Sequence, residues 1–255
     1  MSKIAHGRVL NWKPDLPDHR DHRYVKVKPW YRRFPARVDL RAQCPPIVDQ
    51  GQIGSCTANA IAGALGFLEI AKDPAFQFSS FEPFSRLFIY WRERVMEGDP
   101  MQDAGAMIRD GVASCFQKGA CREKTWPYDA NKLFTTPSQP CYAEAYGHKL
   151  TKYMRLNNLN LTELLDCLAA GFPFVFGISV FASFFMTGRD GMVPAPYGPL
   201  EGGHALLCVG YDLASQRFIV RNSWGTGWGD QGYCYIPFGY LTNMNLADDF
   251  WTLRR

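Results

Sequence analysis

Residues 56–71 are apolar on nearly every face of a helix, and this pattern constrains the fold more than any other in the chain. A helix on the surface of a globular protein has an apolar stripe and a polar face. A helix without a polar face needs packing partners on all sides. We therefore expect this helix to lie in the centre of the molecule and to end near Pro74.

Helical patterns fill the first half of the chain, and strand patterns fill the second half. Further helices are predicted over residues 84–96 and 106–117, and strands over residues 174–181, 204–211, 217–222 and 232–237. This order predicts an α+β protein with two lobes, a mainly helical lobe over residues 35–150 and a mainly β lobe over residues 151–255. Residues 1–34 have no helical apolar period and are expected to form an N-terminal extension.

Residues 167–186 carry no charge, and the stretch is as long as a membrane-spanning helix. Gly171, Phe172 and Pro173 interrupt it, and a proline inside a helix costs about 3 kcal/mol. We interpret the stretch as the end of a helix near residue 170 followed by a buried strand. No membrane contact is expected.

The composition is that of an ordinary globular protein: of 255 residues, 47% are hydrophobic and 20% are charged. The formal net charge of +4 is mild, and we expect no nucleic acid among the partners. The first residues lack the apolar segment of a secretory signal peptide. We therefore expect a cytoplasmic protein, or one exported without such a signal.

The chain has eight cysteines, and no pair shows the C-x-x-C spacing of a zinc site. No metal is therefore expected. Cys208 and Cys234 lie in apolar strand patterns and are predicted to be core residues. Cys121 and Cys141 flank a loop-like stretch and could be bridged, but the sequence does not determine connectivity.

Cys56 stands at the predicted start of the buried helix, after a turn that contains Gly51 and Gly54. The free N–H groups and the dipole of a helix N-terminus favour negative charge, which lowers the pKa of a thiol. Gln50 could place its side-chain amide beside the thiol as a hydrogen-bond donor. A lone cysteine at a helix start is more often structural than catalytic, so this motif needs partners elsewhere.

Two later segments supply candidate partners for the thiol. His204 follows Gly202 and Gly203 and opens an apolar strand, which leaves one face of its ring open. Asn222 ends another strand, where it can accept a hydrogen bond from one imidazole nitrogen and direct the other nitrogen to the thiol. Trp224 can shield that hydrogen bond from water. Taken singly, these segments also fit a buried core histidine and a turn rich in glycine and tryptophan.

Taken together, the segments resemble the papain family of cysteine peptidases over residues 35–255. The cysteine and the histidine are 148 residues apart, within the roughly 130–150 of papain-like enzymes. The most specific match is Asn222-Ser223-Trp224-Gly225, followed by Trp228-Gly229 and Gly232-Tyr233. Residues 126–128 resemble a Tyr-Pro-Tyr motif of the family, and residues 35–41 resemble the start of its mature enzymes.

This resemblance implies a papain-like two-lobed fold with the active site in the groove between the lobes and no cofactor. It implies that Cys56 is the nucleophile, His204 the base, Asn222 the orienting amide and Gln50 an oxyanion-hole donor. The chain would then be a thiol protease, a hydrolase that acts on proteins or peptides.

The resemblance also implies substrate-binding residues. Gly105 falls where glycines of the family bind the substrate backbone. Trp224 and Trp228 are expected on the leaving-group side of the cleft, and Gly203 is a further expected substrate contact.

The sequence departs from the family pattern around these residues. Thr57 follows the nucleophile where the family usually has tryptophan, and Ala104 replaces the first of the paired glycines. Ile53 stands where a cysteine usually forms a disulfide. The extension is too short for the family's long helical propeptide.

Residues 1–34 hold nine Lys or Arg against three Asp. They fit either a surface strap or a zymogen-like inhibitory segment that contacts the cleft, since functional lids are often irregular segments of this length.

The expected reaction is acyl transfer to water through an acyl-enzyme on Cys56. Two alternatives stay open. A transferase or transpeptidase would use the same triad with another acceptor, and a non-catalytic binding module would keep the fold with an unreactive Cys56.

Overall fold

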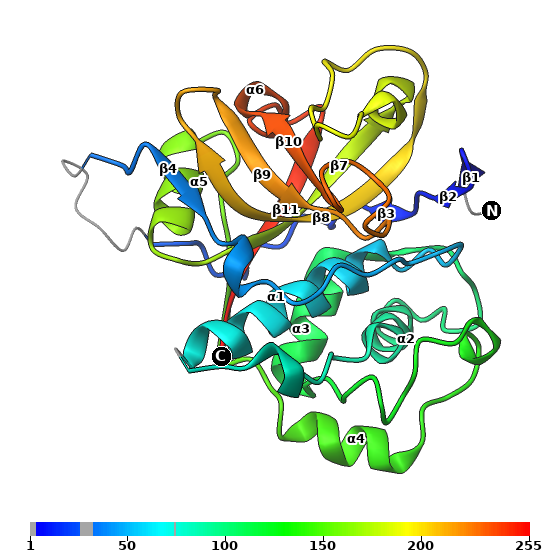
Figure 1. Cartoon of the computed structure of the whole chain (residues 1–255). Coiled ribbons are helices and arrows are strands. Elements are labelled where there is room, and N and C mark those ends of the chain that lie inside the picture. The colour runs from blue at the N-terminus through cyan, green and yellow to red at the C-terminus, as the bar shows by residue number, and fades with distance from the viewer. Residues whose placement is uncertain (1–3, 26–32, 74) are drawn as a thin grey trace.

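The computed structural model describes residues 4–25, 33–73 and 75–255, which form two lobes (Figure 1). The helical lobe contains α1 (Cys56–Lys72), α2 (Arg86–Met96), α3 (Ile108–Gln117) and α4 (Gln139–Tyr146). The helices expected over residues 56–71 and 84–96 are confirmed to within two residues. The third expected helix begins two residues late, because Ala106–Met107 form the short strand β5.

The β lobe is built on one sheet whose strands are β4 (Arg37–Asp39), β6 (Lys152–Arg155), β7 (Phe174–Phe181), β8 (Leu200–Asp212), β9 (Arg217–Arg221), β10 (Tyr233–Pro237) and β11 (Ala247–Arg254). The strand order is β10-β9-β8-β7-β11-β6, with β4 paired to β8. All of these pairings are antiparallel. The helices α5 (Leu161–Ala169) and α6 (Phe238–Leu241) complete this lobe. The four expected strands are present, but β8 begins at Leu200, four residues before the expected start, so His204 lies within the strand.

The uncharged stretch over residues 167–186 divides as the proline predicts. Helix α5 ends at Ala169 and β7 begins at Phe174. Within the described ranges, no helix combines the length and apolar character needed to cross a bilayer.

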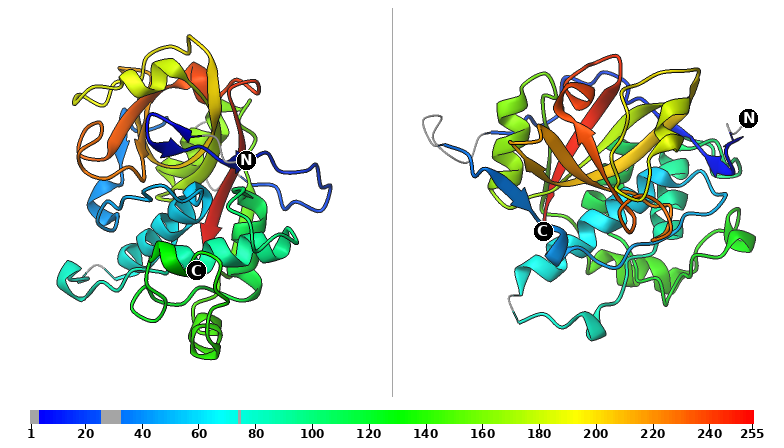
Figure 2. Two further views of the ribbon diagram at one scale, coloured as in Figure 1. Left: turned by 90° about the vertical axis from the view of Figure 1, so that its right-hand side faces the viewer. Right: turned by 45° about the horizontal axis from the view of Figure 1, so that its top comes forward.

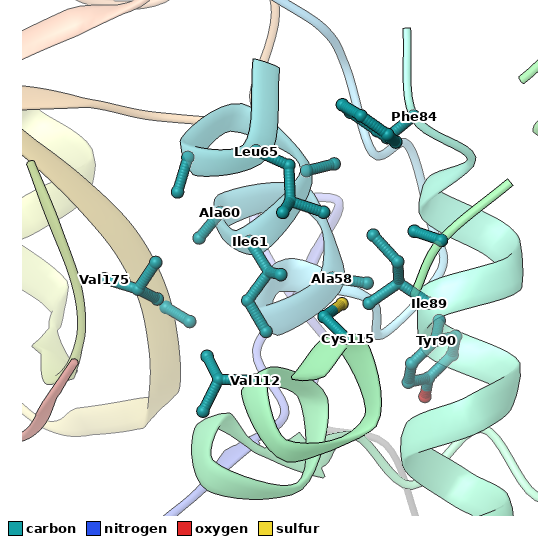
Figure 3. Close-up of a cluster of buried hydrophobic side chains, with 14 of the residues drawn as sticks. Ala58, Ala60, Ile61, Leu65, Phe84, Ile89, Tyr90, Val112, Cys115 and Val175 are labelled. Carbon is teal, nitrogen blue, oxygen red and sulfur yellow. The ribbon is translucent and has the colours of Figure 1, made fainter. Parts of the chain in front are cut away.

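Helix α1 lies between the two lobes, as its apolar composition predicts. Figure 3 shows Val175 of the β lobe and Val112 of α3 on one side of Ile61, and Ile89 of α2 on the opposite side. All four side chains are buried, and each fully buried side chain of this size contributes roughly 1.5–3 kcal/mol. The helix therefore fixes the position of Cys56, its first residue, relative to the β lobe.

One strand lies outside the helical lobe in which the sequence placed it. Strand β4 precedes the helical lobe in sequence but pairs with β8, so residues 37–39 belong to the sheet of the β lobe. The chain thus crosses from one lobe to the other between β4 and α1.

All eight cysteines are buried free thiols. Cys208 and Cys234 are core residues of the β lobe, as expected. Cys121 and Cys141 form no disulfide, although Cys141 lies close enough to raise the pKa of the Cys121 thiol, after the larger effect of burial.

Residues 4–25, which we call the strap, contain β1 (Ile4–Ala5), β2 (Arg8–Val9) and β3 (Trp12–Lys13). Strands β1 and β2 form a hairpin, and β3 pairs in parallel with β5 of the helical lobe. Asn11 bridges to Gly203 of the β lobe. The strap therefore passes between the lobes and bonds to both (Figures 1 and 2).

Candidate active site

Cys56 is the first residue of α1 and is fully buried. The N-cap residue Ser55 makes no side-chain capping bond, and its hydroxyl lies 2.6 Å from Tyr128 Oη instead. The first N–H groups of a helix have no partner within the helix, so they can interact with the sulfur. Hydrogen bonding to the backbone of Ala205, Asn11 and Thr57 favours the thiolate.

Burial nevertheless raises the pKa of the Cys56 thiol to about 11. The expectation of a lowered pKa was therefore wrong for this state of the protein. The backbone hydrogen bonds act in the expected direction, but the desolvation of the buried thiolate is the larger effect.

His204 lies on β8, and its ring is fully buried. Its Nε2 is 2.8 Å from Asn222 Oδ1. The other nitrogen, Nδ1, is buried without a hydrogen-bond partner among the described residues. Burial lowers the pKa of His204 to about 4, against the opposing effect of Asn222 and together with the charge of Arg8 on the strap.

Asn222 follows β9 directly, and its Oδ1 also accepts the backbone N–H of Ser223 at 2.7 Å. This second bond orients the amide oxygen toward the imidazole. Trp224 stacks on His204, with ring centroids 4.8 Å apart and an interplanar angle of 29°. Trp224 is itself buried, so the hydrogen bond is shielded from water as the sequence predicted.

Gln50 is fully buried in the loop that leads to α1. Its Oε1 accepts the hydroxyl of Ser223 at 2.6 Å, and its Nε2 donates to Ile53 O at 3.1 Å. A primary amide has two N–H donors, so one of them is left for another acceptor. Ser223 was not predicted to take part, and it links the loop before Cys56 to the residue after Asn222.

The two expected substrate-binding glycines face the strap. A Cβ atom on Gly105 would lie 1.7 Å from Asn11 O, and one on Gly203 would lie 2.5 Å from Trp12 O. Glycine at both positions lets an extended chain pass at close range. Trp228, the remaining expected contact, packs against Trp224 with ring centroids 5.2 Å apart.

The strap runs along the groove between the lobes. Leu10 to Pro14 line this groove together with Ala104 of the helical lobe and Ser179, Leu200, Gly202 and Gly203 of the β lobe. Asn11 contacts Cys56 through its backbone and donates from Nδ2 to Asp103 O at 3.1 Å. The composition of residues 1–34 does not reveal that Asn11 and Trp12 occupy the groove.

Further polar contacts hold the strap on both sides of the groove. Arg8 donates to Asp49 Oδ1 at 2.6 Å and to Trp224 O at 3.0 Å. At the far end, Tyr24 donates to Asp166 Oδ2 at 2.8 Å. The strap is thus anchored before and after the residues that cover Cys56.

Residues 34–250 match the family described as papain family cysteine protease. The chain belongs to the papain family. The described residues form no cluster of His, Cys, Asp and Glu that could hold a metal ion.

Two proteins are about 40% identical to the chain. Xylellain, a cysteine protease from Xylella fastidiosa, is 42% identical, with a TM-score of 0.85 over 96% of this chain and 95% of that one. An uncharacterized peptidase C1-like protein of Acanthamoeba polyphaga mimivirus is 41% identical over 81% of this chain and 69% of its own length.

Cathepsin K of Gallus gallus is 29% identical over 87% of this chain but only 64% of its own length. The chain therefore spans less than two thirds of that papain-family relative. Digestive procathepsin L 3 of Tenebrio molitor, 20% identical with a TM-score of 0.70, shares the fold.

Proposed function

We propose that the chain hydrolyses peptide bonds, with Cys56 as nucleophile and His204 as general base and acid. One observation carries this proposal. Asn222 Oδ1 is hydrogen-bonded to Nε2 of His204, and Nδ1 of the same ring has no hydrogen-bond partner among the described residues. The backbone of the next residue, Ala205, contacts the Cys56 sulfur. The nitrogen that is left is thus available to exchange a proton with the thiol.

In the proposed reaction, Nδ1 of His204 takes the thiol proton and the Cys56 thiolate attacks the substrate carbonyl. The backbone N–H of Cys56 and the second N–H of the Gln50 amide stabilise the oxyanion, and one such donor can contribute about 3 kcal/mol. His204 then protonates the leaving amine. It finally accepts a proton from the water that hydrolyses the acyl-enzyme.

We further propose that the strap keeps the enzyme inactive. Neither the Cys56 nor the His204 side chain reaches solvent, and Asn11 of the strap contacts the Cys56 sulfur. With the thiol pKa near 11 and the imidazole pKa near 4, both groups are neutral at neutral pH. The covered state therefore excludes substrate and also disfavours the thiolate–imidazolium pair.

The experiment is peptide hydrolysis by Cys56→Ala and by Cys44→Ala, a matched change of another buried cysteine. Cys56→Ala is expected to abolish turnover with the fold retained by circular dichroism, while Cys44→Ala keeps it. Turnover by folded Cys56→Ala contradicts the proposal. Adding an amine acceptor separates hydrolysis from acyl transfer, because a transferase would form the amide as its main product.

A further inference from the structure

We propose that Glu97 is a specificity-determining residue that binds a basic side chain of the substrate, two or three residues before the scissile bond. The inference rests on the proposed peptidase function and adds which peptides the cleft prefers. It is drawn from the strap, which lies in the groove as an extended chain and so shows which side chains the groove can hold.

The position of the strap sets the distance of this subsite from the nucleophile. Asn11 contacts Cys56, and the next two residues pair with β5 in the register Trp12–Ala106 and Lys13–Met107. An extended chain advances about 3.3 Å per residue, so Lys13 lies about two residues, or 7 Å, along the groove from the nucleophile. Strand β5 follows directly after Gly105, the glycine assigned to the substrate backbone, whereas Arg8 contacts Trp224 on the expected leaving-group side. The strap therefore runs in the direction opposite to a substrate, and Lys13 lies where a residue before the scissile bond would lie.

Lys13 Nζ lies 2.7 Å from Glu97 Oε2. The side chain of Glu97 is only 6% exposed, whereas that of Lys13 is 38% exposed. Glu97 Oε1 accepts the backbone N–H of Met107 at 2.7 Å. The Glu97 carboxylate is thus held in the helical lobe beside β5, the strand that pairs with the extended strap. Lys13 belongs to the strap and leaves with it.

The charges around Glu97 favour a cation when the strap leaves. Asp110 lies close enough that Glu97 and Asp15 help to raise its pKa to about 6, after the larger effect of burial, while Arg109 and Lys13 lower it. Lys13 is the cation paired with Glu97, so release of the strap leaves this carboxylate without its partner. Release also frees Arg109, because its ion pair at 2.7 Å is with Asp21 of the strap.

A nearly buried carboxylate without a counter-ion is unfavourable. A lysine or arginine of a substrate placed as Lys13 is would restore the pair, with a charge-assisted hydrogen bond to a carboxylate that Met107 already holds in position.

The test compares fluorogenic peptides that differ only in carrying lysine or norleucine, at the second and at the third position before the scissile bond. The full chain is used, and the quantity compared is the ratio of kcat/KM for the two peptides. The fraction of molecules with the strap released affects both peptides equally and cancels from this ratio. We expect a preference for lysine of about tenfold at one of the two positions, as for a desolvated charge pair.

Glu97→Gln is expected to reduce this preference to nearly onefold. Glu82→Gln is the matched control, because Glu82 forms an exposed ion pair with Lys124 in the same lobe, and it is expected to keep the preference. An acetyl-lysine peptide removes the charge on the substrate side and is expected to behave as the norleucine peptide does, which tests the inference even if Glu97→Gln does not fold.

Equal kcat/KM for the lysine and norleucine peptides in the wild type overturns this inference and leaves the proposed function standing. A lysine preference that persists in folded Glu97→Gln, or with acetyl-lysine, also overturns it. Absence of cleavage of every peptide by a folded, reduced protein overturns the proposed function, and the inference with it.

Discussion

Asn222 Oδ1 lies 2.8 Å from Nε2 of His204, and the opposite ring nitrogen is buried without a hydrogen-bond partner in the described part of the chain. This asymmetry defines the orientation of the imidazole. A ring flip would place a carbon against the amide oxygen and lose the buried hydrogen bond, so Asn222 holds the ring with Nδ1 available for proton transfer.

Asn222→Ala is expected to lower kcat/KM for peptide hydrolysis without abolishing it, because Cys56 and His204 remain. Loss of a hydrogen bond to a buried group costs about 1–3 kcal/mol, which corresponds to a decrease of about fivefold to a hundredfold. Asn245→Ala, at an exposed position, is the control and should have no effect. An unchanged rate in Asn222→Ala would show that the orienting role is wrong.

The strap depends on a glycine in β7. A Cβ atom on Gly177 would lie 2.0 Å from Cε2 of Trp12, so Gly177→Ala should displace the strap. Overpacking of this kind typically costs about 1–3 kcal/mol. We therefore expect alkylation of Cys56 by iodoacetamide in the full chain to accelerate by about fivefold to a hundredfold.

Gly239→Ala is the matched control, because a Cβ atom there would meet open space. The labelling rate of this control should equal that of the wild type. The same labelling rate in a folded Gly177→Ala protein would contradict the packing of Trp12 against β7.

The stability of the folded chain with the strap in place should depend on pH through Asp249 and Asp15. The buried Asp249 accepts the backbone N–H of Asp15 at 2.7 Å and lies 2.9 Å from Arg155. Burial raises the pKa of both carboxyls above the ordinary value of 3.8, against the opposing charge of Arg155, and Asp248 adds to the rise at Asp249. Arg109 opposes it at Asp15.

A carboxyl with a raised pKa binds more protons in the folded state than in the unfolded state. The stability that it contributes is therefore lost as the pH rises from about 4 through the raised pKa. We expect the urea concentration at the unfolding midpoint of the full chain to decrease as the pH rises from about 5 to about 8. The decrease should be less steep in Asp249→Asn. Identical pH dependence in the two proteins would show that Asp249 does not contribute to the pH dependence of stability.

Much of the fold and of the candidate site could be predicted because the relevant patterns are local. The apolar character of residues 56–71 requires burial on all sides, and the alternation of strand and turn residues marks β7 to β10. Cys56 begins α1, Asn222 directly follows β9 and His204 lies within β8, so their convergence follows once the elements pack.

The course of the strap could not be predicted, because it depends on contacts distant in sequence. Asn11 pairs with Gly203 and Lys13 with Glu97, and no local pattern in residues 1–34 encodes either pair. The wrong prediction for the Cys56 pKa has a similar origin, because the burial that raises this pKa arises from the packing of segments distant in sequence. The strap contacts also explain the late start of α3, because residues 106–107 pair with the strap instead of continuing the helix.

Cys56 is proposed to be the nucleophile and the N-terminal segment is proposed to keep it covered. The direct test is to react an epoxide that labels papain-like thiols with the full chain and with a chain lacking residues 1–34, and to map the adduct by mass spectrometry. Circular dichroism checks that both proteins are folded. We expect labelling of Cys56 in the shorter chain and little or none in the full chain. Equal labelling in both would contradict the inhibitory role of the strap, and no labelling of Cys56 in either folded, reduced protein would contradict its role as nucleophile.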